Sequence, residues 1–162
     1  MSIELPHYTQ EKHNTCALAC LRMVLAGYGV HVRESELEAQ ARMDVKGMPI
    51  DELARLARHF GLVAGIQDTT VAGLRRLLAE GRLPIAFIDR AVFDLSPRQR
   101  ARHSLRNAII PNVIPVHVTA RSVTLHDPRQ PRVTRKTIRL FRRAYSGLGG
   151  RCVVCSMPKE KA

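Results

Sequence analysis

Cys16 is the residue of this sequence best placed to act as a nucleophile. It follows Asn14 and Thr15, either of which can cap a helix, so its thiol is expected in the first helical turn. The partial positive charge of a helix N-terminus favours the thiolate, which is the nucleophilic form of cysteine. Gln10 lies six residues earlier on an extended stretch, and its side-chain amide can donate to an oxyanion that forms beside the sulfur. The pattern favours acyl transfer, against the alternative that Cys16 is a small buried apolar residue.

Hydrophobic periodicity indicates helices in the first half of the chain and strands in the second. We predict helices over residues 16–27, 35–41, 48–61, 70–81 and 137–147, and strands over residues 62–66, 83–88, 107–119, 122–126 and 151–157. The polar pair Ala120-Arg121 separates two of these strands and predicts a hairpin. This order predicts an α+β fold, with N-terminal helices packed on a mainly antiparallel C-terminal sheet.

Several weak motifs occur in an order that resembles the C39 family of cysteine peptidases. These papain-like enzymes cut leader peptides after a double glycine, and they usually form the N-terminal domain of bacteriocin-exporting ABC transporters. The resembling elements are the spacing from Gln10 to Cys16, the helix Cys-x-x-Ala-Cys-Leu-x-Met from Cys16, the segment from Gly47 to Gly61-Leu62, the pair Pro84-Ile85, the triplet His126-Asp127-Pro128, and the segment from Phe141 to Gly147. The elements cover nearly the whole chain, so the resemblance implies a single domain over residues 1–162.

The resemblance also implies roles for individual residues. Cys16 corresponds to the nucleophile, Gln10 to the oxyanion donor, and Asp127 to the residue that orients the catalytic histidine. The implied substrate is a peptide or protein, and acidic peptides belong to this class. The implied partner is a separate transporter. No metal and no cofactor are expected.

The family's histidine has no obvious counterpart here. Sixteen residues before Asp127 the chain has Pro111, and the nearest histidine on this strand is His117. In a regular hairpin His117 lies opposite Thr124, three residues out of register with Asp127 and on the other face of the sheet. A β-bulge at Pro111 or Pro115 is needed to redirect it.

His13 and His103 are weaker candidates for the base, because nothing in the sequence fixes where their loops lie. The alternative to a working triad is a catalytically inactive module that keeps the fold and binds a peptide or protein. The remaining histidines, His7, His31, His59 and His126, have no partner at a diagnostic spacing and are expected to be solvated or packed.

The other three cysteines are Cys20, Cys152 and Cys155. With Cys16 they offer four sulfurs, a common ligand set for zinc. Cys152 and Cys155 flank two valines, which predicts a strand, and residues three apart on a strand point to opposite faces. We therefore expect buried strand cysteines and no metal site.

The chain has 162 residues, 45% of them hydrophobic, and a formal net charge of +12. It has neither a signal peptide pattern nor an apolar run that spans a bilayer, so the expected location is the cytoplasm. The charge makes nucleic acid a third class of partner, which has no aromatic stacking platform to support it. The segment Arg90–Arg106 is predicted either as a solvated connection or as a basic surface that shapes the cleft toward an acidic peptide.

Overall fold

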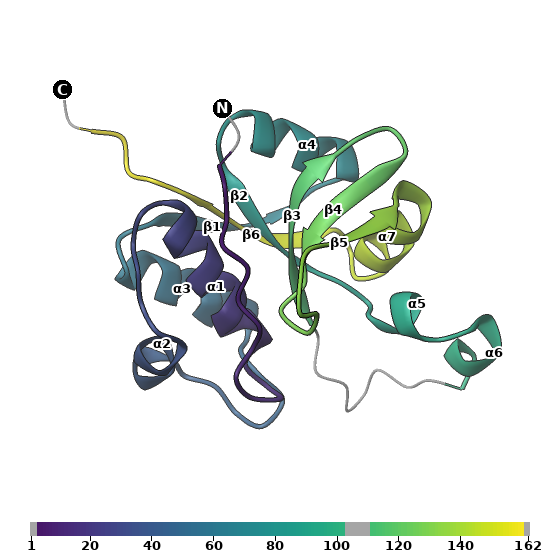
Figure 1. Ribbon diagram of the computed structural model, residues 1–162, viewed down its shortest axis with the longest axis horizontal. Helices are drawn as coiled ribbons and strands as arrows, with labels where there is room; N and C mark the ends of the chain where they lie inside the picture. Colours follow the sequence, from purple (N-terminus) through teal and green to yellow (C-terminus); the bar gives the residue numbers. More distant parts are fainter. Residues whose placement is uncertain (1–2, 103–110, 161–162) are drawn as a thin grey trace.

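The computed structural model describes residues 3–102 and 111–160. Its strands are β1 (Val63–Asp68), β2 (Leu83–Phe87), β3 (Asn112–Val118), β4 (Ser122–His126), β5 (Thr134–Thr137) and β6 (Arg151–Ser156). Its helices are α1 (Cys16–Gly27), α2 (Glu34–Gln40), α3 (Ile50–His59), α4 (Val71–Ala79), α5 (Ala91–Asp94), α6 (Pro97–Arg100) and α7 (Ile138–Ser146). The strands form one antiparallel sheet in the order β1-β6-β2-β3-β4-β5, which confirms the predicted α+β class (Figure 1).

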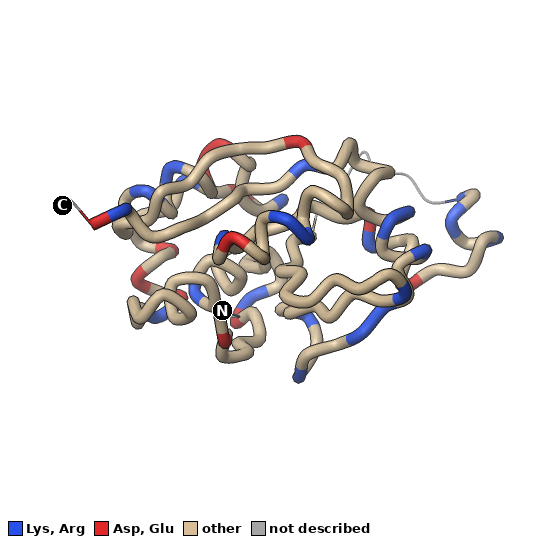
Figure 2. Tube along the Cα trace, turned by 90° about the horizontal axis from the view of Figure 1, so that it is seen from above, with Lys and Arg blue, Asp and Glu red and all other residues tan. Residues whose placement is uncertain are grey.

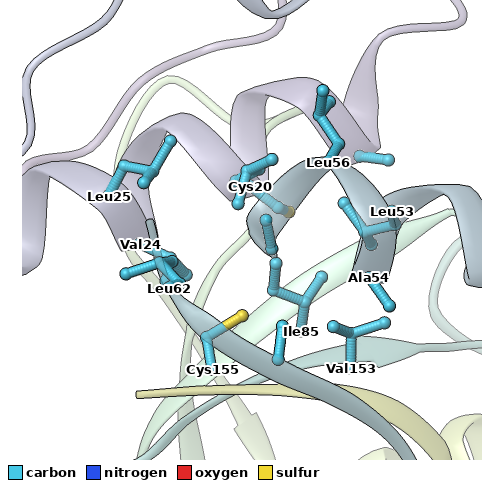
Figure 3. Packing of buried hydrophobic residues seen from close by; sticks show 14 of the residues in the cluster. Cys20, Val24, Leu25, Leu53, Ala54, Leu56, Leu62, Ile85, Val153 and Cys155 are labelled. Carbon is cyan, nitrogen blue, oxygen red and sulfur yellow. The ribbon is translucent and has the colours of Figure 1, made fainter. Parts of the chain in front are cut away.

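One face of the sheet is covered by the N-terminal helices. Ile85 of β2 and Val153 and Cys155 of β6 pack there against Cys20 of α1 and Leu53 of α3, and all five side chains are buried (Figure 3). Figure 1 shows α1, α2 and α3 gathered on this side. Burial of this aliphatic cluster fixes the position of α1, whose first residue is Cys16.

The opposite face carries a second core under α4 and α7. Ala86 and Cys152, the alternate residues of β2 and β6, pack there with Leu74 of α4 and with Phe141 and Tyr145 of α7. Successive strand residues therefore enter different cores, as the two-residue period of a strand requires. This alternation confirms that Cys152 and Cys155 are buried on opposite faces.

The helix N-termini are capped in two different ways. Thr70 and Thr137 accept hydrogen bonds from the backbone N–H groups of Gly73 and Leu140, which confirms them as caps. Thr15 lies at the N-cap of α1 but makes no cap bond. Its hydroxyl instead donates to the carbonyl oxygen of Lys12 at 3.0 Å and accepts from the Lys12 N–H at 3.0 Å, and these bonds hold the turn just before Cys16.

The main differences from the sequence predictions lie in the second half of the chain. The segment Arg90–Arg106 contains the short helices α5 and α6, and its residues from 103 lie outside the described ranges. The first strand of the predicted hairpin, likewise, is described only from Asn112. The edge strand β5 was not predicted, because its sequence Thr-Arg-Lys-Thr lacks an apolar face. No helix in the described ranges has the length and apolar character needed to cross a bilayer.

Candidate active site

Cys16 is buried at the first position of α1, beside the strand β3. Its thiol donates to Oδ1 of Asn112, with 3.5 Å between Sγ and the oxygen. Burial raises the pKa of Cys16 above its ordinary value. Hydrogen bonding with Asn112 and the positive charge of Arg129 lower that pKa in part, but burial dominates. The site therefore favours the protonated thiol over the nucleophilic thiolate.

Asn112 lies beside the sulfur within hydrogen-bond reach, as a general base would have to. It is the first residue of β3, it pairs with Phe87 of β2, and its side chain is only 2% exposed. The backbone carbonyl of Asn112 also accepts the thiol of Cys20 at 3.4 Å. An amide does not take up a proton near neutral pH, so Asn112 cannot activate Cys16 as a base.

The side-chain amide of Asn112 keeps one unused hydrogen-bonding group. Its Nδ2 is buried and has no hydrogen-bond partner among the residues that the structure describes. A buried donor without a partner is costly, unless a ligand or water supplies an acceptor. The amide therefore keeps a buried donor near the Cys16 sulfur that has no acceptor in the described structure.

Asp127 lies just after β4 and is buried, but its partner is an arginine. Nη1 of Arg90 lies 2.8 Å from Oδ2 of Asp127, and the backbone N–H of Arg129 donates to Oδ1 at 3.0 Å. Arg90 also reaches Asp94 at 3.0 Å through its Nε. No imidazole within the described ranges contacts the Asp127 carboxylate. The predicted partner of Asp127, a catalytic histidine, is replaced there by a guanidinium.

His117 is exposed and lies opposite Thr124, as the hairpin register predicted. The structure has the β-bulge next to Pro115, between Pro115 and His117. The bulge leaves His117 remote from the site, in a depression that it shares with Arg75 of α4. Before the bulge, Ile114 pairs with His126. The register of β3 against β4 therefore differs by one residue on the two sides of the bulge. The residue beside Cys16 is Asn112, whereas counting along the sequence had placed Pro111 there.

Of the other two candidate bases, His13 makes no hydrogen bond to the sulfur in the described structure. His13 is exposed in the turn before α1, and its backbone carbonyl accepts a hydrogen bond from Gln10. His103 lies outside the described residues.

Gln10 lies where the sequence placed it, on the extended segment that leads to α1. Its Nε2 donates to the carbonyls of Lys12 and His13 at 2.8 and 3.1 Å, and its backbone N–H donates to the carbonyl of Pro128 at 2.9 Å. The amide donor is therefore used within the turn, whereas Oε1 is buried without a partner in the described part of the chain. Donation to an oxyanion would require the Gln10 amide to turn.

A pair of histidines close to Asp127 was not predicted. Nδ1 of His7 lies 3.2 Å from Nδ1 of His126, and Nε2 of His7 lies 2.7 Å from the carbonyl of Gln130. His7 and His126 are 119 residues apart, so no local pattern could reveal the contact. Together with the bond from Gln10 to Pro128, the pair ties the N-terminal segment to the chain after β4.

The His7–His126 pair predicts a loss of stability in acid. Burial, with a smaller effect of His7, lowers the pKa of His126 from 6.5 to about 4, and His126 is 5% exposed. Because this pKa is lower in the folded chain, the unfolded chain binds the proton more readily below pH 6.5. Lowering the pH from 7 to 4 should therefore reduce the free energy of unfolding through this residue by up to about 3 kcal/mol, at 1.36 kcal/mol per pKa unit.

Urea denaturation at several pH values measures this effect. The matched variant is His126→Gln, which keeps a polar side chain but does not titrate, and its stability should fall less between pH 7 and pH 4. Equal acid losses in the parent protein and the variant would contradict the assignment to His126.

The residues within the described ranges form no cluster of three or more metal-ligating side chains. Cys16 and Cys20 face Asn112, whereas Cys152 and Cys155 enter the two separate cores of the sheet. The four sulfurs therefore do not converge, and the arrangement does not suit a zinc ion.

A pocket of about 410 Å³ lies next to the site. Phe87, the register partner of Asn112, forms part of its wall, together with Met48 and Ile50 from the segment before α3. Nδ2 of Asn14 donates to the carbonyl of Asp44 in the same segment at 3.0 Å, which ties it to the turn before Cys16. The pocket is thus mainly apolar. Its walls are connected to the residues around the thiol by the Asn14–Asp44 hydrogen bond and by the pairing of Phe87 with Asn112.

A helix-borne cysteine beside an antiparallel sheet places the chain among proteins with the cysteine-peptidase fold. The sequence pattern of the peptidase C39 family matches residues 4–89, more than half of the chain. This protein belongs to the peptidase C39 family, as the sequence motifs predicted. No curated protein matches the sequence.

Three solved structures share the fold at low sequence identity. A double glycine motif protease from an AMS/PCAT transporter, solved with its leader peptide, has a TM-score of 0.73 and 17% identity, over 97% of this chain and 94% of that one. A C39-like peptidase from Bacillus anthracis has a TM-score of 0.76 and 14% identity, over 94% of both chains. The peptidase domain of Streptococcus ComA, a bi-functional ABC transporter involved in a quorum sensing pathway, has a TM-score of 0.71 and 14% identity, over 96% of this chain and 99% of that one.

Proposed function

We propose that this protein is a C39-like domain that binds an extended peptide beside Cys16 and does not hydrolyse it. The observation that carries the proposal is the pair of partners at the site: Asn112 faces the sulfur, and Arg90 holds Asp127. Hydrolysis through a cysteine requires a thiolate and a group that protonates the leaving amine. Burial raises the pKa of Cys16, and the Asn112 amide cannot transfer a proton near neutral pH, so both requirements are unmet by these residues.

The same residues suit a peptide ligand. Nδ2 of Asn112 is a buried donor without a partner in the described structure, and a main-chain carbonyl of a peptide supplies the acceptor that it lacks. The adjoining pocket offers the apolar side chains of Met48, Phe87 and Leu148 to a peptide side chain. The neighbour from the AMS/PCAT transporter binds a leader peptide, which supports a peptide of this kind as the ligand.

A transporter is the partner that we infer for this domain. Two of the structural neighbours are peptidase domains or proteases of transporters. In this arrangement the domain would hold the leader of a cargo peptide, and proteolysis would be left to another protein.

The test uses a panel of fluorescently labelled peptides that contain a double glycine. We expect saturable binding by fluorescence anisotropy, intact peptide by mass spectrometry, and unchanged affinity in Cys16→Ala. Cleavage that disappears in Cys16→Ala would overturn the proposal in favour of an active peptidase. Absence of saturable binding to every peptide would overturn it as well.

A matched pair of variants in one loop locates the bound peptide. Met48 lines the pocket, whereas Val45, three residues away, is exposed and does not. Met48→Lys should weaken binding about tenfold, the effect expected when a charge replaces one apolar contact of roughly 1.4 kcal/mol. Val45→Lys makes the same change of charge and should leave the affinity unchanged.

A further inference from the structure

The net charge of the protein is confined to one part of the chain. Residues 95–151 contain thirteen Lys and Arg residues and a single acidic residue, Asp127, so this segment alone carries +12. The remaining 105 residues contain thirteen basic and thirteen acidic residues and are formally neutral. In Figure 2 basic positions lie along the whole trace, whereas acidic positions are fewer toward the end away from the C-terminus.

The basic residues of the two parts differ in their partners. In the N-terminal part, Lys12, Arg22, Arg33, Arg55, Arg82 and Arg90 form ion pairs with carboxylates. In the described part of residues 95–151, Arg151 is the one basic residue with such a pair, to Asp68. The single carboxylate of the segment, Asp127, is already held by Arg90. The segment therefore presents positive charge that the folded protein does not neutralise.

The elements of this segment bring the unneutralised arginines to the surface. Phe141 and Tyr145 anchor one side of α7 in the core, which leaves Arg139, Arg142 and Arg143 exposed on the other. The adjacent strand β5 adds Arg135, which is exposed on one face of the sheet, and Lys136, whose ammonium lies over the ring of Phe93 on the other. We define the arginine surface as Arg129, Arg132, Arg135, Lys136, Arg139, Arg142 and Arg143.

The arginine surface begins at the candidate site. Arg129 lines an open depression together with Gln10, Lys12 and His13, the residues of the turn before α1. Arg129 is also close enough to lower the pKa of Cys16 by its charge. From there the chain passes through Arg132 into β5 and on to α7. A ligand that leaves the site past Arg129 therefore meets further positive charge along its path.

The chemistry of the surface selects among anionic partners. Six of its seven members are arginines, which pair with carboxylates through two parallel hydrogen bonds. Val133 is the one large apolar side chain exposed in the described part of residues 95–151, at 40%. The surface thus offers neither the aromatic platform on which single-stranded nucleic acid stacks nor the apolar face that inserts into a bilayer.

We propose that the arginine surface binds an acidic segment of the same polypeptide that the site holds beside Cys16. This inference rests on the proposed function, because it places the ligand's acidic part relative to the portion bound at the thiol. The place of Arg129 favours a polypeptide, since Arg129 lines the depression at the turn before Cys16 and a single flexible chain bound there can continue along the surface. Glu and Asp side chains of that chain supply the carboxylates that residues 95–151 lack.

The test compares two double-glycine peptides that differ only in an added tail of six glutamates or six glutamines. We expect the glutamate peptide to bind about tenfold more tightly at low ionic strength, the effect of a few exposed ion pairs, and the advantage to shrink as salt screens them. Arg142→Glu with Arg143→Glu should abolish this advantage and leave the affinity for the glutamine peptide unchanged.

The matched control is Arg75→Glu with Arg76→Glu. These residues are also adjacent exposed arginines on a helix, α4, so the change in net charge is the same. The control variant should keep the preference for glutamate. An equal loss of preference in both double variants would overturn the proposal, because it would mean that only total charge matters. No preference in the parent protein would also overturn it.

Further measurements distinguish a failure of this inference from a failure of the proposed function, and an acidic peptide from other anionic partners. If neither tailed peptide binds, the proposed function fails, and the surface is tested with hexaglutamate alone. Binding of hexaglutamate that is lost in Arg142→Glu/Arg143→Glu but kept in the control would still support the surface, and absence of binding would overturn it. Tighter binding of an oligonucleotide or of anionic vesicles, with the same sensitivity to these variants, would overturn the proposal in favour of that partner.

Discussion

Replacing Arg90 by Met should lower the free energy of unfolding by about 3–5 kcal/mol, the cost of leaving one member of a buried ion pair without its partner. Arg90 and Asp127 are 10% and 4% exposed in their side chains and lie 2.8 Å apart. Without the guanidinium, the N–H of Arg129 is the one donor to the Asp127 carboxylate that remains among the described residues. Urea denaturation at pH 7 measures the loss.

Two further variants make the Arg90 result specific. Arg151→Met breaks the pair to Asp68, in which both side chains are more than half exposed, so it should cost less than about 1 kcal/mol. Adding Asp127→Asn to Arg90→Met removes the unpaired charge and should restore part of the stability. Similar losses in Arg90→Met and Arg151→Met would contradict the buried pair.

Asn112→His should raise the rate at which iodoacetamide alkylates Cys16 at pH 7 by about tenfold or more. An imidazolium beside the sulfur favours the thiolate, and an opposite charge at this range lowers a pKa by one to three units. The parent protein should react slowly at this pH, because burial raises the pKa of Cys16. Mass spectrometry of the alkylated peptide, with Cys16→Ala as the background, gives the rate as a function of pH.

The control for Asn112→His is Asn112→Asp, which keeps the shape of the side chain and places a negative charge beside the sulfur. That charge disfavours the thiolate, so alkylation should become slower than in the parent protein. Equal rates in the His, Asp and parent proteins would contradict the contact between residue 112 and Cys16. Because Arg90 still holds Asp127, we expect the imidazole of Asn112→His to activate the thiol without the orientation that a triad gives.

The parts of the site that the sequence predicted are those carried by local patterns. The apolar spacing of α1 and the preceding polar residues placed Cys16 at a helix start, and the position of Gln10 followed from its distance along the same segment. The hairpin register of His117 was also confirmed, because a short turn fixes which residues are opposite. These features depend on neighbours within about twenty residues.

The partners of Cys16 and Asp127 could not be predicted in the same way. The residue beside Cys16 is Asn112, whereas the count gave Pro111, and the bulge after Pro115 changes the register of β3 by a further residue. A bulge adds a residue without a sequence signal strong enough to place it. Arg90 is 37 residues from Asp127, and their contact depends on where the ends of β2 and β4 lie in the folded sheet.

The tie between the N-terminal segment and the chain after β4 sets an order of assembly during synthesis. His7 and Gln10 leave the ribosome first, whereas Gln130, bonded to His7, follows 123 residues later. At typical rates of about 5–20 residues per second, this interval is roughly 6–25 s. The helices α1 to α3 can form in that time, but the bond that ties the Gln10 backbone to the chain after β4 must wait for Pro128. The region around the thiol is therefore among the last parts of the molecule to close.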